Sequence, residues 1–138
     1  MEHVKEYLTQ ASGVERRIEA KLYKIEYYRR LAERVTNIFS TEKVSGGVSL
    51  RSRIEDCVCR IIELETAVAD DIHKLVKLKA EAEQLIREVK QAEYQRLLEL
   101  RYICCKSLEE VADTMGYSYR QVTRLHKAAL ENIALEFE

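Results

Sequence analysis

The sequence contains no proline and only four glycines among its 138 residues. At average usage, a chain of this length would carry about seven prolines and about ten glycines. Turn-rich folds such as β-sandwiches and α/β enzymes depend on these two residues at their turns. Their scarcity argues against such folds and predicts an all-α protein built from long helices.

Other features that the sequence lacks exclude further classes. Hydrophobic residues make up 46% of the chain, which is too many for a disordered protein. The longest apolar stretches are a few residues long, too short for a transmembrane helix. The N-terminal sequence MEHVKEYLTQASG lacks the apolar core of a secretory signal. We therefore expect a cytoplasmic protein with no membrane partner, whose net charge of −1 indicates no particular partner by itself.

The sequence also lacks the motifs of enzymes and metal sites. The cysteines form a CxC and a CC pair instead of the wider spacing of zinc ligands, and they are Cys57, Cys59, Cys104 and Cys105. We interpret them as small hydrophobic residues. The histidines stand apart from plausible catalytic partners, and no glycine-rich phosphate loop is present. We expect neither enzymatic activity, nor a cofactor, nor a small-molecule substrate.

The glycines divide the chain into three parts. We predict an N-terminal head at residues 1–13, a helical hairpin at 14–91 with a loop at 41–50, and a C-terminal domain at 92–138. The loop is indicated by Gly46 and Gly47 with serines on either side. Before it, apolar residues recur in helical steps of three or four, at Ile18, Leu22, Ile25, Tyr28, Ala32, Val35 and Phe39.

After the loop, apolar residues follow a seven-residue repeat that is typical of a coiled coil. The repeat consists of Ile54, Ile61, Val68, Leu75, Ala82 and Val89, with Cys57, Leu64, Leu78 and Leu85 at the companion position. At the exception, Asp71, we expect Ile72 to take the apolar role. The first half of this seam can pack on the preceding helix. The second half, past Lys77, outruns that helix and must pack on the C-terminal domain or on a second copy; we expect a homodimer through the 54–89 seam.

The C-terminal domain carries two capping boxes, at Ser107–Glu110 and Ser118–Gln121. They predict a short helix that ends near Thr114 and a longer one that runs to about Phe137, after a first helix at about 94–103. Gly116 stands between the boxes, where a tight turn needs a positive φ. The residues expected to pack the two helices together are Val111, Ala112, Met115, Tyr117, Val122 and Leu125. This arrangement predicts a helix-turn-helix.

The start of the last helix has the composition of a DNA-reading surface. From Ser118 to Lys127 three residues are cationic and none is acidic. The residues that do not fit the packing pattern are Ser118, Tyr119, Arg120, Gln121, Thr123, Arg124, His126 and Lys127. Arginine can bind guanine, glutamine can bind adenine, and threonine can contact the thymine methyl group. Lys127 and Arg124 could equally hold phosphates, and the helix N-termini at Ser107 and Ser118 offer N–H groups to phosphate. The predicted partner is therefore double-stranded DNA.

The stretch LLELRYICCKSLEEVADTMGYSYRQVTRLHKAALENI, residues 97–133, resembles region 4 of the sigma-70 family. A helical N-terminal half followed by such a domain is similar to small phage transcription regulators of the ArpU type. The resemblance implies late-gene control in phages or prophages, with Tyr119, Arg120, Gln121, Thr123 and Arg124 on the base-facing part of the recognition helix. Nothing in the chain resembles sigma region 2, so promoter melting is not expected. The alternative is a protein–protein adaptor that binds RNA polymerase or a sigma factor, with DNA contact secondary.

Overall fold

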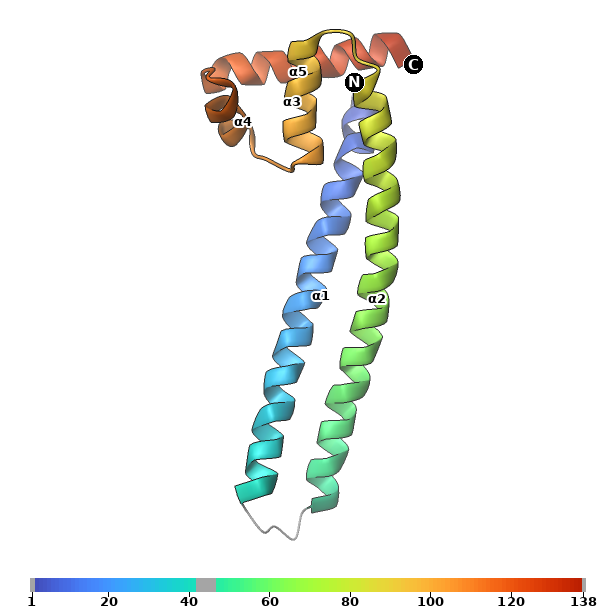
Figure 1. The fold of residues 1–138 in the computed structure, drawn as a ribbon, viewed down its shortest axis with the longest axis vertical. Helices are drawn as coiled ribbons and strands as arrows, with labels where there is room; N and C mark the ends of the chain where they lie inside the picture. Colours follow the sequence, from blue (N-terminus) through green and yellow to red (C-terminus); the bar gives the residue numbers. More distant parts are fainter. Residues whose placement is uncertain (1, 42–46, 138) are drawn as a thin grey trace. The chain divides into compact units, whose positions relative to one another are not determined.

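The computed structural model describes residues 2–41 and 47–137, and over these residues every regular element is helical. The elements are α1 (Glu2–Thr41), α2 (Gly47–Arg87), α3 (Ala92–Leu98), the π-helix η1 (Glu99–Ile103), α4 (Leu108–Met115) and α5 (Tyr119–Phe137) (Figure 1). The predicted all-α class is confirmed. Of the predicted loop, residues 42–46 lie outside the described residues, as does the side chain of Phe39. No helix in the described part of the chain is long and apolar enough to cross a membrane.

The chain divides into two compact units. One consists of Glu15–His73 and is called the hairpin unit below; the other consists of Met1–Val14 together with Lys74–Glu138 and is called the terminal unit. The long helices α1 and α2 each contribute to both units.

In the hairpin unit, α1 and α2 lie side by side and run in opposite directions (Figure 1). Ile25, Leu64 and Val68 form its buried core, and Ile18, Tyr28 and Ile61 pack against them. These residues recur every third or fourth position on both helices, as the repeat in the sequence predicted. The apolar seam positions between residues 54 and 89, all of them on α2 except Val89, are buried or half-buried.

The expected role of Ile72 was wrong. Asp71 itself occupies the seam, with 8% of its surface exposed, and its carboxylate pairs with the ammonium group of Lys21 on α1. Ile72 and Leu22, the residues that follow these two, are about half exposed. Because one residue corresponds to about 100° around a helix, only one of two neighbours can face the seam. The ion pair offsets the cost of burying charge in the seam, so Lys21 and Asp71 face the seam in place of Leu22 and Ile72.

The expected head at residues 1–13 was also wrong, because α1 begins at Glu2 and continues through Gly13. An exposed glycine inside a helix costs only about 1 kcal/mol relative to alanine. Burial of Val4 and Leu8 against Ala82 and Ile86 outweighs that cost.

The second half of the α2 seam therefore does not outrun α1. It is covered by α1 within the same chain, in the core that holds Val4, Leu8, Ala82, Ile86 and Val89. The reason for placing a second copy on this seam no longer holds, and self-association itself stays a prediction.

The core of the terminal unit joins these ends of α1 and α2 to the four C-terminal elements. Its buried residues from those elements are Leu97, Leu98, Tyr102, Val111, Ala112, Val122, Ala129, Leu130 and Ile133. The side-chain amide of Gln95 on α3 donates to the backbone carbonyls of Ile86 and Arg87, at 3.4 and 3.2 Å. These bonds satisfy carbonyls at the end of α2 that have no partner within the helix, and they fix α3 to α2.

Candidate nucleic-acid interface

Both predicted capping boxes are present and fix the starts of α4 and α5. The Ser107 hydroxyl accepts from the Glu110 backbone N–H at 3.2 Å, and the Glu110 carboxylate accepts from the Ser107 N–H at 3.4 Å. At α5, the Ser118 hydroxyl accepts from the Gln121 N–H at 3.2 Å, and the Gln121 side-chain oxygen accepts from the Ser118 N–H at 2.9 Å. Each box satisfies two N–H groups that a helix start otherwise leaves without a partner.

The turn between the two helices is centred on Gly116, whose φ of 73° confirms the predicted left-handed conformation. The backbone N–H of Tyr117 donates to the carbonyl of Ala112 at 3.0 Å, which closes the end of α4. The hydroxyl of Tyr117 donates to the Glu93 carboxylate on α3 at 2.5 Å. The turn is therefore held both by its own backbone and by α3.

The predicted packing residues all join the core of the terminal unit. Val111, Ala112 and Val122 are buried, and Met115, Tyr117 and Leu125 are half-buried against them. Together with the turn at Gly116, they form a helix-turn-helix in which α5 is the second helix.

The opposite face of α5 is exposed and cationic. Arg120, Thr123, Arg124 and Lys127 are exposed, and they share one face of the helix because Thr123 and Arg124 lie three and four residues after Arg120, and Lys127 lies three residues after Arg124. Tyr119 precedes them and is also exposed. Glu131, four residues after Lys127, is the next exposed residue on this face, and its charge ends the cationic stretch. The face is therefore a candidate for contact with a polyanion such as DNA.

Two of the predicted contact residues have an additional role in the helix itself. Gln121 uses its side-chain oxygen in the capping box, so in a contact with adenine through both its oxygen and its nitrogen this oxygen would have to accept two hydrogen bonds. The Thr123 hydroxyl donates to the Tyr119 carbonyl at 2.9 Å, which leaves its methyl group as its free contact surface.

The two helix N-termini differ in their suitability for phosphate. Glu109 and Glu110 lie in the first turn of α4, where their charge opposes that of a phosphate. The first turn of α5 contains no acidic residue. Of the two serines predicted to mark phosphate sites, Ser118 therefore marks the more favourable one, and Ser107 acts as a helix cap.

His126 does not belong to the exposed face. Only 8% of its surface is exposed, and its Nε2 lies 2.6 Å from the Tyr102 hydroxyl. Its pKa is lowered from 6.5 to about 4, first by burial and then by the positive charges of Arg101 and Lys5. Burial also raises the pKa of Tyr102 to about 12. The hydroxyl and Nε2 share one hydrogen bond, and the hydroxyl is its donor when the ring proton is on Nδ1.

Tyr102 reaches His126 from the π-helix, which the sequence did not predict. The N–H of Cys104 donates to the carbonyl five residues earlier, Glu99, at 3.0 Å. Position 126 lies four residues after the buried Val122, and this spacing was the signal that could have placed His126 on the packing face. The pair ties α5 to the element that precedes the helix-turn-helix.

Residues of α3 that the sequence did not single out border the cationic face. Glu93, Gln121 and Arg124 line one hollow together with Tyr117, and Arg96 lines a neighbouring hollow that shares Glu93 and Tyr117. Arg96 and Arg124 therefore flank the Tyr117–Glu93 hydrogen bond. Arg96 is an additional candidate for a phosphate contact.

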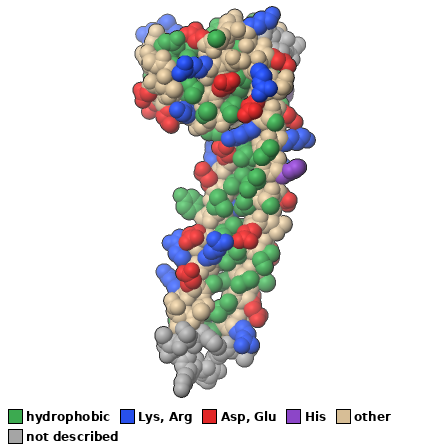
Figure 2. Space-filling view, viewed as in Figure 1, with side chains coloured by type: hydrophobic (Ala, Val, Ile, Leu, Met, Phe, Trp, Pro, Cys, Tyr) green, Lys and Arg blue, Asp and Glu red, His purple; other side chains and the backbone are tan. Residues whose placement is uncertain are grey.

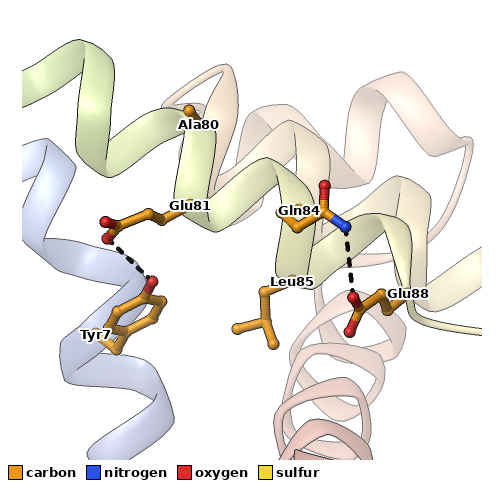
Figure 3. A pocket seen from close by; sticks show the side chains of 6 residues that line it. All are labelled: Tyr7, Ala80, Glu81, Gln84, Leu85 and Glu88. Atoms are coloured by element: carbon orange, nitrogen blue, oxygen red, sulfur yellow. Dashed lines mark hydrogen bonds between the residues drawn. The ribbon is translucent and has the colours of Figure 1, made fainter.

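Another hollow of the terminal unit has acidic residues in its lining, in contrast to the cationic face of α5 (Figure 3). It is lined by Tyr7, Ala80, Glu81, Gln84, Leu85 and Glu88. The Tyr7 hydroxyl donates to Glu81 at 3.3 Å, and the Gln84 amide donates to Glu88 at 3.4 Å. Burial and the charge of Glu81 raise the pKa of Tyr7. With two carboxylates at its rim, this hollow is unsuited to a phosphate backbone.

The four cysteines occupy different environments. Cys57 is buried and Cys105 is half-buried, whereas Cys59 and Cys104 are exposed, so the interpretation as small hydrophobic residues fits the first two. Within the residues that the structure describes, no group of three or more His, Cys, Asp or Glu side chains could hold a metal ion.

Comparison with known proteins places the chain in a family. No curated protein and no solved structure matches it. A family model described as "protein of unknown function (DUF1492)" matches residues 34–134, which is more than half of the chain and contains α2, α3, η1 and α4 in full. The chain therefore belongs to the DUF1492 family.

Proposed function

We propose that this protein is a sequence-specific regulator of transcription that binds double-stranded DNA and reads the major groove with α5. The observation that carries the proposal is the exposed face of α5. It presents Arg120, Arg124 and Lys127 with no acidic residue between them, and the opposite face of the helix packs into the core of the terminal unit.

We expect the DNA contacts to differ by position along the helix. Recognition helices enter the groove with their N-terminal residues toward the bases. Arg120 and Arg124 are one turn apart in this first part of α5 and suit guanine edges. Lys127, a further turn along, suits a phosphate on the groove wall. Tyr119 and the Thr123 methyl group offer apolar contact beside the two arginines.

The resemblance of residues 97–133 to sigma region 4 supports a role in transcription. The likeness of the whole layout to ArpU-type regulators supports late-gene control in a phage or prophage. The predicted site of action is the cytoplasm, where phage or prophage DNA would be transcribed.

The adaptor function is the second candidate, because α4 presents the opposite charge. Glu109, Glu110 and Asp113 are all exposed on it, and the chain as a whole has a net charge of −1. Such a surface suits contact with a basic patch on RNA polymerase or on a sigma factor better than contact with DNA.

The first experiment selects bound sequences from a random pool of duplex DNA with the full chain and measures affinity for the selected site at several salt concentrations. Arg120→Ala and Arg124→Ala should each cost about 1–3 kcal/mol and relax specificity at one base position. Lys127→Ala should weaken binding to all sequences and reduce the salt dependence by about one phosphate contact. Arg16→Ala, at an exposed arginine of the hairpin unit, is the matched control and should change nothing.

A second variant separates DNA reading from folding. Gln121→Glu keeps a side-chain acceptor for the Ser118 N–H, since glutamate is favoured at this position of a capping box. It also replaces an amide donor with a negative charge at the proposed interface. We expect unchanged stability and a loss of DNA affinity of at least about tenfold.

The outcomes discriminate between the two functions. If no sequence is enriched and neither arginine variant changes binding to any DNA, the DNA-reading proposal is wrong. Binding of purified RNA polymerase that survives Arg120→Ala but is lost on reversal of the α4 acids would then establish the adaptor.

A further inference from the structure

One face of α1, within the hairpin unit, carries exposed tyrosines together with cations. It is called the tyrosine face below and consists of Tyr23, Lys24, Tyr27, Arg30 and Arg34. All five residues are exposed, and the exposed fractions of Tyr23 and Tyr27 are 76 and 59%. Because each residue turns a helix by about 100°, the five side chains project within about a third of its circumference. That third faces away from Ile25, which lies in the buried core of the unit.

The charge on the tyrosine face is of one sign. The acidic residues between positions 23 and 34 are Glu26 and Glu33, and both project beside the face, on the flank next to Arg30. The Nε of Arg30 lies 3.7 Å from Oε1 of Glu26, and both side chains are more than half exposed. An ion pair this exposed is weak, so Arg30 stays able to bind another anion. Two other cations of α1 pair with acidic residues of α2 and join the helices.

The two tyrosine rings have a set spacing along the helix. The ring of Tyr27 meets the ring of Tyr28 edge to face, with centroids 5.3 Å apart and an angle of 76° between the planes. Tyr28 packs against the buried core of the hairpin unit and so supports Tyr27. Tyr23 and Tyr27 are one turn apart, a rise of about 6 Å. Figure 2 shows that the visible surface of this unit carries both hydrophobic and cationic side chains.

We propose that the tyrosine face binds single-stranded DNA. Unpaired bases stack on Tyr23 and Tyr27. The phosphates that join these bases are held by Lys24, Arg30 and Arg34. Surfaces that bind single strands combine aromatic rings with cations in this way, and they accept many sequences because every base has a flat π-face. A single strand is therefore a partner that uses both kinds of side chain on the face.

The spacing of the rings favours a single strand over a duplex. Stacked bases in a duplex follow one another at about 3.4 Å, whereas the two rings are about 6 Å apart along α1. Neighbouring bases reach both rings only when they separate, which an unpaired strand allows. A duplex and an acidic polypeptide would each engage chiefly the cations. The choice of DNA over RNA rests on the proposed function, which brings the chain to DNA; the face itself involves no residue of α5.

The test measures binding of the full chain to a short, labelled oligothymidylate by fluorescence anisotropy. The bases of this probe do not pair with one another. Tyr23→Leu and Tyr27→Leu keep an apolar side chain on the helix but remove the stacking ring, and each should weaken binding at least about fivefold. Ile62→Ala is the matched control, because Ile62 is 57% exposed on α2 of the same unit, and it should bind like the wild type. Circular dichroism checks that all variants keep their helix content.

The cations are tested through the salt dependence of binding. Arg34→Ala should weaken binding and should reduce the slope of log affinity against log salt concentration by about 0.7, the value for one phosphate of a single strand. Arg51→Ala removes an exposed arginine of α2 from the same unit. It is the matched control and should leave both the affinity and the slope unchanged.

Further probes separate single-stranded DNA from other polyanions. A duplex of mixed sequence, oligouridylate and polyglutamate are each added as competitors of the bound oligothymidylate. We expect each of them to compete more weakly than unlabelled oligothymidylate does. Arg120→Ala, a substitution on α5, should keep its affinity for the oligothymidylate, because the strand binds the hairpin unit.

Several results would overturn the proposal. They are a wild-type chain that does not bind the oligothymidylate, tyrosine variants that keep full affinity, and loss of binding in Arg120→Ala. Equal competition by the duplex or by polyglutamate would show a surface that responds to charge alone, and stronger competition by oligouridylate would show an RNA site. The reading of duplex DNA by α5 is tested by selection from a duplex pool, so its failure and failure here remain distinguishable.

Discussion

The buried His126–Tyr102 pair should make the terminal unit sensitive to mild acid. The folded protein holds His126 neutral, with its pKa lowered from 6.5 to about 4. The unfolded chain takes up the proton freely below about pH 6.5. The contribution of His126 to stability is therefore fully present above that pH and is lost progressively as the pH falls toward 4. A protonated ring carries a hydrogen on both nitrogens, so it can only donate to the Tyr102 hydroxyl and never accept from it.

The size of the loss follows from the two pKa values. One pKa unit corresponds to about 1.4 kcal/mol. At pH 5 the medium is about 1.5 units below the unfolded pKa and still above the folded one, so the free energy of unfolding should fall by about 2 kcal/mol relative to neutral pH. This is a large fraction of the stability of a small domain.

The assay is urea denaturation followed by far-UV circular dichroism at pH 7.5 and pH 5.0. His126→Gln replaces the ring with a neutral amide that can still accept from Tyr102, and it should lose about 2 kcal/mol less than the wild type between the two pH values. His73→Gln, at an exposed position of α2, is the matched control and should behave like the wild type. If His126→Gln and the wild type lose equal stability, the buried neutral histidine is not the cause and the reasoning fails.

The remaining predictions concern helix positions and one ion pair. Gly13→Ala should raise the free energy of unfolding by about 0.5–1 kcal/mol, because Gly13 is helical and an added Cβ meets nothing within 4 Å; a lower value would mean that α1 is not helical there. Gly116→Ala should lower it by about 1–2 kcal/mol, because the φ of 73° disfavours any side chain. Ser107→Ala should cost about 1 kcal/mol and speed amide exchange in the first turn of α4; unchanged exchange would contradict the cap. Lys21→Met should cost about 1–3 kcal/mol by leaving Asp71 without that cation, and adding Asp71→Leu should recover the loss in a double-mutant cycle.

The parts of the fold that the sequence predicted depend on local patterns. Both capping boxes were predictable because the residues that bond one another are three apart along the chain. Gly116 was predictable because a left-handed position disfavours side chains. The seam on α2 was predictable because burial repeats every seven residues wherever two long helices pack.

The parts that the sequence did not predict depend on residues far apart in the chain. Asp71 looked like a fault in the seam because its cation, Lys21, lies fifty residues away. His126 looked exposed because its partner, Tyr102, reaches it from a π-helix whose geometry no local pattern announced. Gly13 looked like a helix break because the low helix propensity of glycine is visible in the sequence. The burial of Val4 and Leu8 against α2, which compensates for it, is not.

The local charge of each helix, rather than the net charge of the chain, is what matters for the proposed function. Its net charge of −1 suggests no affinity for DNA, yet charges farther apart than the screening length of about 8–10 Å contribute little to one another at physiological salt. In the complex that we propose, a DNA duplex held against α5 would therefore interact mainly with Arg120, Arg124 and Lys127. Under either proposed function, the segregation of charge between the two helices, and not their sum, is the property that matters: it would let a nearly neutral chain bind DNA through α5, or a basic protein partner through α4.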